Sequence, residues 1–137
     1  MISEFRGQYY FLSNFYEAPV TWDGLTYPNN EAAFQSAKLE DRRAREQFVN
    51  LDPSSAKRLG RRIQLRPDWE QIKYNVMQEI CIAKFTQNKD LRERLLATGD
   101  KYLEEGNTWG DTVWGTVDGK GLNMLGKILM QVRDQLR

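Results

Sequence analysis

The sequence DWEQIKYNVMQEICIAKFTQ, residues 68–87, predicts the central element of the chain. Apolar residues follow one another there at intervals of three and four positions, at Trp69, Ile72, Val76, Ile80 and Ala83. This spacing places their side chains on one face of an α-helix. Asp68, directly before the first of them, is a favourable N-cap residue. We therefore expect a long core helix that begins after Asp68 and extends to about Gln87.

Shorter helices are expected on both sides of this core helix. Asn29 or Asn30 can cap a helix that begins at Glu31, because residues 31–39 are rich in good helix formers. Further helical patterns cover residues 42–50, 54–59, 91–96 and 125–136. The pattern over residues 54–59 is entered through Asp52-Pro53 and ended by Gly60, and the next one stops near Gly99.

The N-terminal third has the pattern of short strands. Val20–Trp22 and Leu25–Tyr27 flank Asp23-Gly24, a two-residue hairpin signal, and Tyr9–Leu12 is expected to form another extended segment. With no internal repeat or linker, we expect an α+β fold. It is a compact, mainly helical single domain, residues 1–137, with a small N-terminal antiparallel sheet.

Composition narrows the classes of function. The 20 Lys and Arg against 19 Asp and Glu give a net charge of +1, which argues against a generally basic DNA-coating protein. Any affinity for phosphate must therefore come from local clusters. The sequence has no apolar run of about 20 residues and no export signal at its start, so we expect a soluble, cytoplasmic protein that does not insert into a membrane.

The absence of histidine limits the chemistry most strongly. The chain has no His and one cysteine, Cys81, which excludes Ser-His-Asp triads and the usual zinc sites. We expect no metal and no cofactor. If the chain is an enzyme, proton transfer and nucleophilic attack fall to Asp, Glu, Lys, Tyr, Cys81 or water.

The first candidate site is the segment EAAFQSAK, residues 31–38. On an α-helix, Glu31, Gln35 and Lys38 share one face, within roughly 60° of one another. In a cleft, such a face could orient a sugar and attack it, because a desolvated lysine loses its proton more readily. The alternative is an ordinary solvated helix face.

The second candidate is the Gly- and Trp-rich loop of residues 106–121, which leads into the C-terminal helix. Its glycines permit close approach of a ligand to the backbone, and Trp109 or Trp114 offers a stacking surface for a base. Asp111 is either a catalytic carboxylate or a turn former. The alternative is a set of ordinary turns around core tryptophans.

Two further segments have polar or charged patterns. Five cations without an intervening acid suggest a partner with a pyrophosphate or nucleic-acid backbone, and they are Lys57, Arg58, Arg61, Arg62 and Arg66. A solvated face is the alternative. In residues 11–16, Asn14 could bind a ribose or a base, while the aromatic residues around it favour a core role.

In this order, these segments resemble the NADAR family of N-glycosidases. The resemblance extends over nearly the whole chain. It rests on Ser13-Asn14-Phe15, Tyr27-Pro28, Glu31, Phe34-Gln35, Lys38, Gly60-Arg61, Trp69, Lys73, Val76-Met77, Lys84-Phe85, Gln87, Leu103, Glu105, Asp111, Trp114-Gly115, Gly119-Lys120-Gly121, Asn123, Leu125-Gly126 and Leu129-Met130.

The resemblance implies hydrolysis of a base-to-ribose N-glycosidic bond. The implied substrates are ADP-ribosylated guanine in nucleic acid and, as an alternative, early riboflavin-pathway intermediates, which are small ribose phosphates. It also implies a lysine adduct at the sugar. The implied catalytic residues are Glu31, Lys38 and Asp111, and the implied substrate contacts are Asn14, Phe15, Gln35, Arg61, Trp69, Trp114, Gly115 and Asn123.

The sequence departs from the family pattern in two places. Ala32 stands where the family usually has His, so that position is not expected to be essential to the reaction. The spacing from Glu105 to Asp111 is about one residue longer than usual, and the loop after Gly115 about one shorter, so substrate preference is expected to differ. A binding module without catalysis, for ADP-ribose or nucleic acid, remains the alternative of another class.

Overall fold

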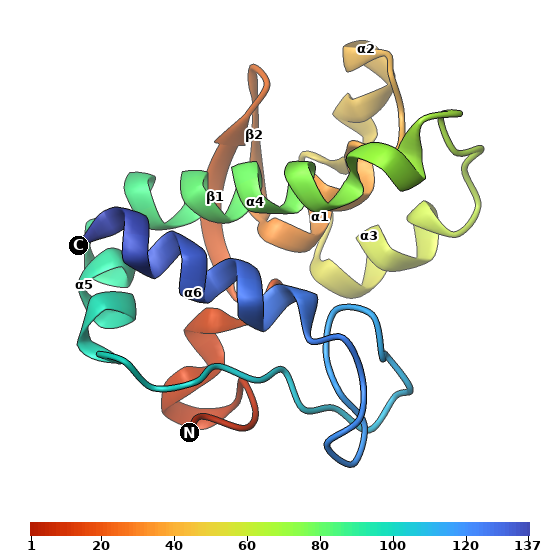
Figure 1. Cartoon of the computed structure of the whole chain (residues 1–137). Coiled ribbons are helices and arrows are strands. Elements are labelled where there is room, and N and C mark those ends of the chain that lie inside the picture. Colours follow the sequence, from red (N-terminus) through yellow and green to blue (C-terminus); the bar gives the residue numbers. More distant parts are fainter. The chain divides into compact units, whose positions relative to one another are not determined.

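The computed structural model describes residues 1–137 as two compact units (Figure 1). The middle unit is Asn14–Asn88, and the terminal unit combines Met1–Ser13 with Lys89–Arg137. Helices are the main regular secondary structure of both units, and the sheet has two antiparallel strands, which confirms the mainly helical α+β class. That the chain is one domain stays a prediction. No helix combines the length and the hydrophobicity that crossing a bilayer would need.

The predicted hairpin is confirmed in the middle unit. Strands β1 (Glu17–Trp22) and β2 (Leu25–Asn29) pair antiparallel, with Val20 opposite Tyr27. Asp23 and Gly24 connect them with φ angles of 49° and 86°, as a two-residue hairpin turn with positive φ at both positions requires. Val20 and Tyr27 are buried, and α4 packs against β1 (Figure 1).

The predicted core helix is α4 (Trp69–Gln87), the longest element of the chain. Its buried residues are Trp69, Val76, Met77, Ile80, Cys81, Lys84 and Phe85, whereas Ile72 and Ala83 of the predicted face are only half-buried. Asp68 occupies the N-cap position, but its carboxylate makes no capping bond. It accepts a hydrogen bond from Arg66 Nε at 2.6 Å instead, so the predicted cap is only positional.

Four shorter helical segments complete the middle unit. Helix α1 (Asn30–Ser36) begins where predicted, and the Asn29 side chain accepts the Ala32 N–H at 2.7 Å. It ends earlier than predicted, because the Lys38 N–H bonds to the Gln35 carbonyl in a tighter turn. The helix expected over residues 42–50 is divided into α2 (Arg42–Arg45) and η2 (Glu46–Phe48). Helix α3 (Pro53–Gly60) follows its Asp52 cap.

The terminal unit contains η1 (Gly7–Leu12), α5 (Lys89–Ala97) and α6 (Met124–Leu136), and α5 packs against α6. The extended segment predicted over Tyr9–Leu12 is wrong, because these residues form a 3-10 helix. Phe11 and Leu12 are both buried, although neighbouring side chains of a strand would face opposite sides. The helix predicted around Leu91–Leu96 is confirmed, and Gly99 follows it with a φ of 65°.

Cys81 should be unreactive while the chain is folded. Its thiol is fully buried, and burial raises its pKa to about 12. Because the thiolate is the nucleophile, we expect its reaction with an aromatic disulfide reagent at pH 8 to be slower by more than about 10³-fold than in the unfolded chain. Absorbance of the released thiol, with and without denaturant, measures both rates. Similar rates would contradict this environment.

Candidate functional site

Glu31 and Gln35 lie on one side of α1, one turn apart. Glu31 lies in the first turn, where its N–H bonds to the Asn14 carbonyl at 3.0 Å. Its side chain is 8% exposed, and Gln35 Nε2 donates to its Oε2 at 2.6 Å. The amide thereby fixes the orientation of the carboxylate, as expected for a group that must face a reacting atom.

Gly60 creates the space that Gln35 occupies. A Cβ atom at position 60 would lie 1.9 Å from Gln35 Oε1, so no larger residue fits without moving the amide. Helix α3 ends at Gly60, as predicted, although the φ of Gly60 is not positive. The absent side chain of Gly60 also allows close packing against α1.

Lys38 lies just beyond the end of α1, not on the helix face predicted for it. Its side chain is half-buried, and Nζ donates to the Gly60 carbonyl at 3.4 Å. Burial lowers the pKa of the Lys38 amine, the Glu31 carboxylate partly opposes that effect, and the Arg61 guanidinium adds to it. The structure thus brings Glu31, Gln35 and Lys38 together, with an amine that loses its proton more readily than a free lysine.

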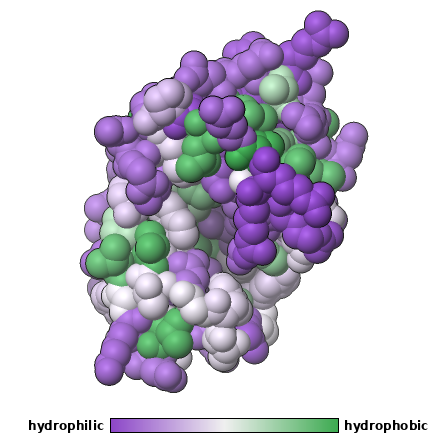
Figure 2. Space-filling model, turned by 90° about the vertical axis from the view of Figure 1, so that its right-hand side faces the viewer, coloured by the Kyte–Doolittle hydropathy of each residue, from purple (hydrophilic) through white to green (hydrophobic).

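The basic run divides into paired and unpaired residues. Arg58 donates to Ser55 Oγ at 3.1 Å, Arg66 pairs with Asp68, and Lys57 Nζ lies 5.9 Å from the centre of the Phe15 ring. Arg61 and Arg62 are exposed and form no ion pair. Figure 2 shows the molecule from the side on which α3 and the following segment lie in Figure 1, and mainly hydrophilic residues cover its upper part. Arg61 and Arg62 are thus exposed cations of the run that an anion can reach.

Asn14 and Trp69, two predicted substrate contacts of the middle unit, are both buried. Asn14 Oδ1 accepts from Asn30 Nδ2 at 3.2 Å, and its own Nδ2 lies 3.5 Å from the sulfur of Met77. The Trp69 ring packs on Phe34, with 5.1 Å between the ring centres. These contacts hold both residues against α1.

Asp111, in the terminal unit, shapes its own loop. Its Oδ1 accepts the Val113 and Trp114 N–H groups at 3.1 and 2.9 Å. Its backbone exchanges two hydrogen bonds with the Asn107 amide. The turn-forming interpretation of Asp111 is therefore correct for Oδ1, while Oδ2 remains available for other chemistry.

Asn123 and Gly115 connect this loop to α6. Asn123, with a φ of 52°, accepts the Glu105 N–H at 2.9 Å and donates to the Leu103 carbonyl at 2.9 Å. A Cβ at Gly115 would lie 2.1 Å from the Glu105 carbonyl oxygen. Trp114, next to Gly115, is half-buried, whereas Trp109 is 55% exposed. Asn123 and Gly115 thus have structural roles in the loop.

Lys84 is a buried lysine of α4 for which the sequence predicts no role. It is 1% exposed, and its Nζ lies 5.6 Å from the centre of the Tyr16 ring. Burial lowers the pKa of Lys84 to about 8. A signal was present in the sequence, because position 84 follows Ile80 by four residues and so continues the core face of α4.

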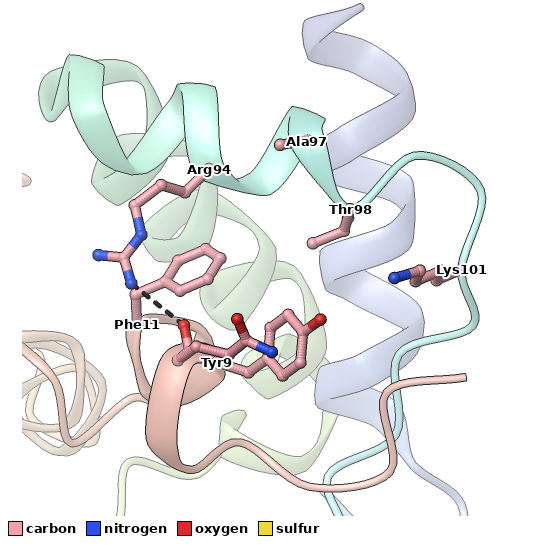
Figure 3. A pocket seen from close by; sticks show the side chains of 7 residues that line it. Tyr9, Phe11, Arg94, Ala97, Thr98 and Lys101 are labelled. Carbon is pink, nitrogen blue, oxygen red and sulfur yellow. Dashed lines mark hydrogen bonds between the residues drawn. The ribbon is translucent and has the colours of Figure 1, made fainter.

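An open cavity of about 400 Å³ contains none of the predicted site residues. It lies within the terminal unit, between η1 and the C-terminal part of α5 (Figure 3). Local geometry, rather than the size of a cavity, distinguishes the cluster of Glu31, Gln35 and Lys38.

Comparison with known proteins identifies the family. The NADAR domain model matches residues 3–137. The chain belongs to the NADAR family. This NADAR chain is 42% identical over 128 residues to N-glycosidase YbiA of Escherichia coli (strain K12), covering 90% of this chain and 79% of that protein. It is also 42% identical over 131 residues to the riboflavin biosynthesis protein VVA0006 of Vibrio vulnificus.

The lengths covered differ between these relatives. The match to the Vibrio protein covers 93% of the NADAR chain but 35% of the longer relative. In structure, the chain is similar to E. coli YbiA as solved by NMR, with a TM-score of 0.84 and 38% identity over 99% of this chain and 86% of that one. The predicted fold of the NADAR family is thereby confirmed.

Proposed function

We propose that this chain removes ADP-ribose from ADP-ribosylated guanine. The wider activity is the one in the name of its E. coli relative, and the chain is an N-glycosidase, a hydrolase of N-glycosyl compounds. The narrower substrate is our proposal. The single observation that supports it most is the cluster of an oriented carboxylate, Glu31, and an amine of lowered pKa, Lys38.

The cluster suits cleavage of a base-to-ribose bond. Breaking that bond builds positive charge at the anomeric carbon, and the Glu31 carboxylate would stabilise this charge more in the transition state than in the ground state. A neutral Lys38 amine would attack the same carbon. The electron pair of the broken C–N bond goes to the guanine nitrogen, which takes up a proton and leaves.

The second half of the reaction releases the sugar. The Lys38 nitrogen loses a proton, and the ribose ring opens to a Schiff base between Lys38 and C1. Water then adds to that carbon, and the C–N bond to Lys38 breaks, which returns the free amine and ADP-ribose. One water molecule is consumed for each bond cleaved, as hydrolysis requires. Asp111 is the other proposed catalytic carboxylate, through its Oδ2.

Exposed cations near the cluster support a substrate with a pyrophosphate. Arg61 and Arg62 follow Gly60, whose carbonyl accepts the Lys38 hydrogen bond. A guanidinium binds phosphate oxygens with two parallel N–H groups. ADP-ribose carries two phosphates beyond the ribose that is attacked, so this pair of cations suits it.

A second substrate has a specific observation in its favour. The Vibrio relative bears the name of a riboflavin biosynthesis protein, and this chain matches 35% of its length. The second candidate substrate for this chain is therefore an early riboflavin intermediate, which also joins a ribose phosphate to a nitrogen. The two substrates differ in salt response, because binding to a nucleic-acid backbone weakens steeply as salt rises.

The test separates these possibilities. The purified chain is incubated, with a chelator present, with ADP-ribosylated guanine in single-stranded DNA and separately with the riboflavin intermediates, and mass spectrometry follows the products. We expect ADP-ribose from the DNA adduct. Release from the metabolites alone would replace our proposal with the second substrate, and binding of ADP-ribose without any turnover would favour a binding module.

The contact between Gly60 and Gln35 gives a test by double mutation. We expect Gly60→Ala to lower kcat/KM about tenfold or more with a modest change in melting temperature, because the methyl group displaces the Gln35 amide from Glu31. Gln35→Ala removes the same hydrogen bond. The double variant should be no slower than Gln35→Ala alone, since both changes act on one contact. Independent, multiplicative losses would contradict this.

The pKa of Lys38 predicts a pH effect. The Arg61 guanidinium helps to lower this pKa, so Arg61→Gln should raise it and leave less neutral amine at a given pH. We therefore expect the rising limb of kcat/KM against pH to move to higher pH. The matched control is Arg62→Gln, which removes the neighbouring exposed cation but should leave the limb in place. Equal profiles for both variants would contradict the coupling.

A further inference from the structure

The cavity of the terminal unit has a cation on each side, Arg94 and Lys101, and aromatic side chains between them (Figure 3). It is lined by Gln8, Tyr9, Phe11, Arg94, Ala97, Thr98 and Lys101, and no acidic side chain is among them (Figure 3). Its volume of about 400 Å³ lies in the range of small-molecule sites. It shares no residue with the proposed glycosidase site, so it calls for a ligand of its own.

Arg94 is held with its guanidinium over an aromatic ring. Its Cζ lies 4.2 Å from the centre of the Phe11 ring, and its Nη2 donates to the Gln8 carbonyl at 3.1 Å (Figure 3). These contacts fix the side chain although it is exposed. A planar guanidinium fixed in this way can stack a base on its free face and bond a phosphate at its edge.

Lys101 provides a second, unpaired cation. Its backbone is fixed, because its N–H bonds to the Thr98 carbonyl and its own carbonyl accepts from Arg133 Nη1 at 2.8 Å. Its ammonium group is exposed and forms no ion pair, whereas the neighbouring Asp100 is paired with Arg137 at 2.7 Å. No acidic side chain therefore neutralises the positive charge of Lys101 beside the cavity.

The remaining lining is suited to an apolar or planar group. Thr98 Oγ1 donates to the Leu95 carbonyl at 2.6 Å and accepts from Arg133 at 3.0 Å, so its polar atom is already bonded. Tyr9 contributes a half-buried ring and Ala97 a methyl group. Anion binding at one side and a flat apolar surface at the other are what a nucleotide requires.

We propose that this cavity binds a nucleotide unit between Arg94 and Lys101, with the base against Tyr9 and the Arg94 guanidinium and the phosphate on Lys101. The unit is either a free nucleotide or one residue of a single strand. The cavity would therefore serve nucleotide recognition. This proposal does not depend on which substrate the glycosidase site cleaves.

The experiment is an NMR titration of the ¹⁵N-labelled full chain with thymidine 5′-monophosphate, with tetrathymidylate and with inorganic phosphate. We expect the nucleotides to shift the amides of residues 8–11 and 94–101 and the Arg94 Nε–H. Binding of the mononucleotide as tightly as the tetranucleotide would assign the cavity to free nucleotides, and binding of the tetranucleotide alone would assign it to a strand. Both results support the proposal.

Charge reversal supplies the control. We expect Lys101→Glu and Arg94→Glu each to weaken nucleotide binding by about tenfold or more, as loss of a charged hydrogen bond does. The Lys101 ammonium group forms no ion pair, so its replacement breaks none. Lys89→Glu makes the same charge change on α5 outside the cavity and should stay within about twofold. Equal weakening by Lys89→Glu, shifts confined to other residues, or phosphate binding as tightly as the nucleotides would overturn the proposal.

Discussion

The Lys38→Ala variant should lose turnover by at least about 10³-fold, because the proposed reaction depends on a nucleophilic amine at this position. The fold should tolerate the change. The Lys38 ammonium makes one long hydrogen bond, 3.4 Å to the Gly60 carbonyl, and its side chain is only half-buried. A melting curve close to that of the unaltered chain would show that the loss is chemical and not structural.

Chemical trapping tests the same step directly. Borohydride reduces a Schiff base to a stable amine, so treatment during turnover should leave the mass of the reduced sugar phosphate on Lys38, found by peptide mapping. Lys73→Ala is the matched control, because Lys73 is another partly buried lysine of the middle unit, paired with Glu70 at 2.8 Å. That variant should be trapped normally.

Two results would oppose the covalent mechanism. A Lys38→Ala variant of normal rate would dispose of it outright. Trapping on another lysine would identify that lysine as the nucleophile. Lys84 is the main candidate, because burial also lowers the pKa of its amine. Lys84 is 1% exposed, which is why we place the reaction at the more accessible Lys38.

Features that depend on short stretches of sequence were predictable. The Asp23-Gly24 turn requires positive φ at two neighbouring residues, and the apolar spacing of α4 continues for several turns. Both signals lie within the element that they specify. Tyr9–Leu12 was mispredicted because strand-forming residues need a partner strand, and the sheet contains only β1 and β2.

The site was predictable only in its residue types. Glu31 and Gln35 lie one helical turn apart, so their contact follows from local geometry. The room that Gly60 leaves for Gln35 depends on a residue 25 positions away, which no local pattern records. The hydrogen bonds of Asn123 to Leu103 and Glu105 also join residues far apart in the sequence. They give a structural role to Asn123, which was predicted as a substrate contact. Packing between distant segments was therefore the missing information.

Replacing Glu31 by glutamine should lower kcat by roughly 10²–10³-fold, the usual cost of removing one group that stabilises charge in the transition state. The substitution preserves the shape of the side chain and an oxygen that can accept the Gln35 N–H, so the melting temperature should change little. Glu31→Ala should be at least as slow. Rates on ADP-ribosylated guanine, or on whichever N-glycoside proves to be cleaved, provide the measurement.

The pH profile of Glu31→Gln separates the proposed role from a simple effect on Lys38. The Glu31 carboxylate raises the pKa of the Lys38 amine, so its removal should lower that pKa and leave more neutral amine at pH 7. If Glu31 only adjusted the nucleophile, the variant would be faster at neutral pH. We expect the variant to be slower at every pH, with the rising limb of its pH profile displaced to lower pH.

Asp111→Asn serves as the comparison, because it also removes a carboxylate but keeps an oxygen for the loop N–H groups. A large loss in Asp111→Asn with little loss in Glu31→Gln would transfer the charge-stabilising role to the terminal unit.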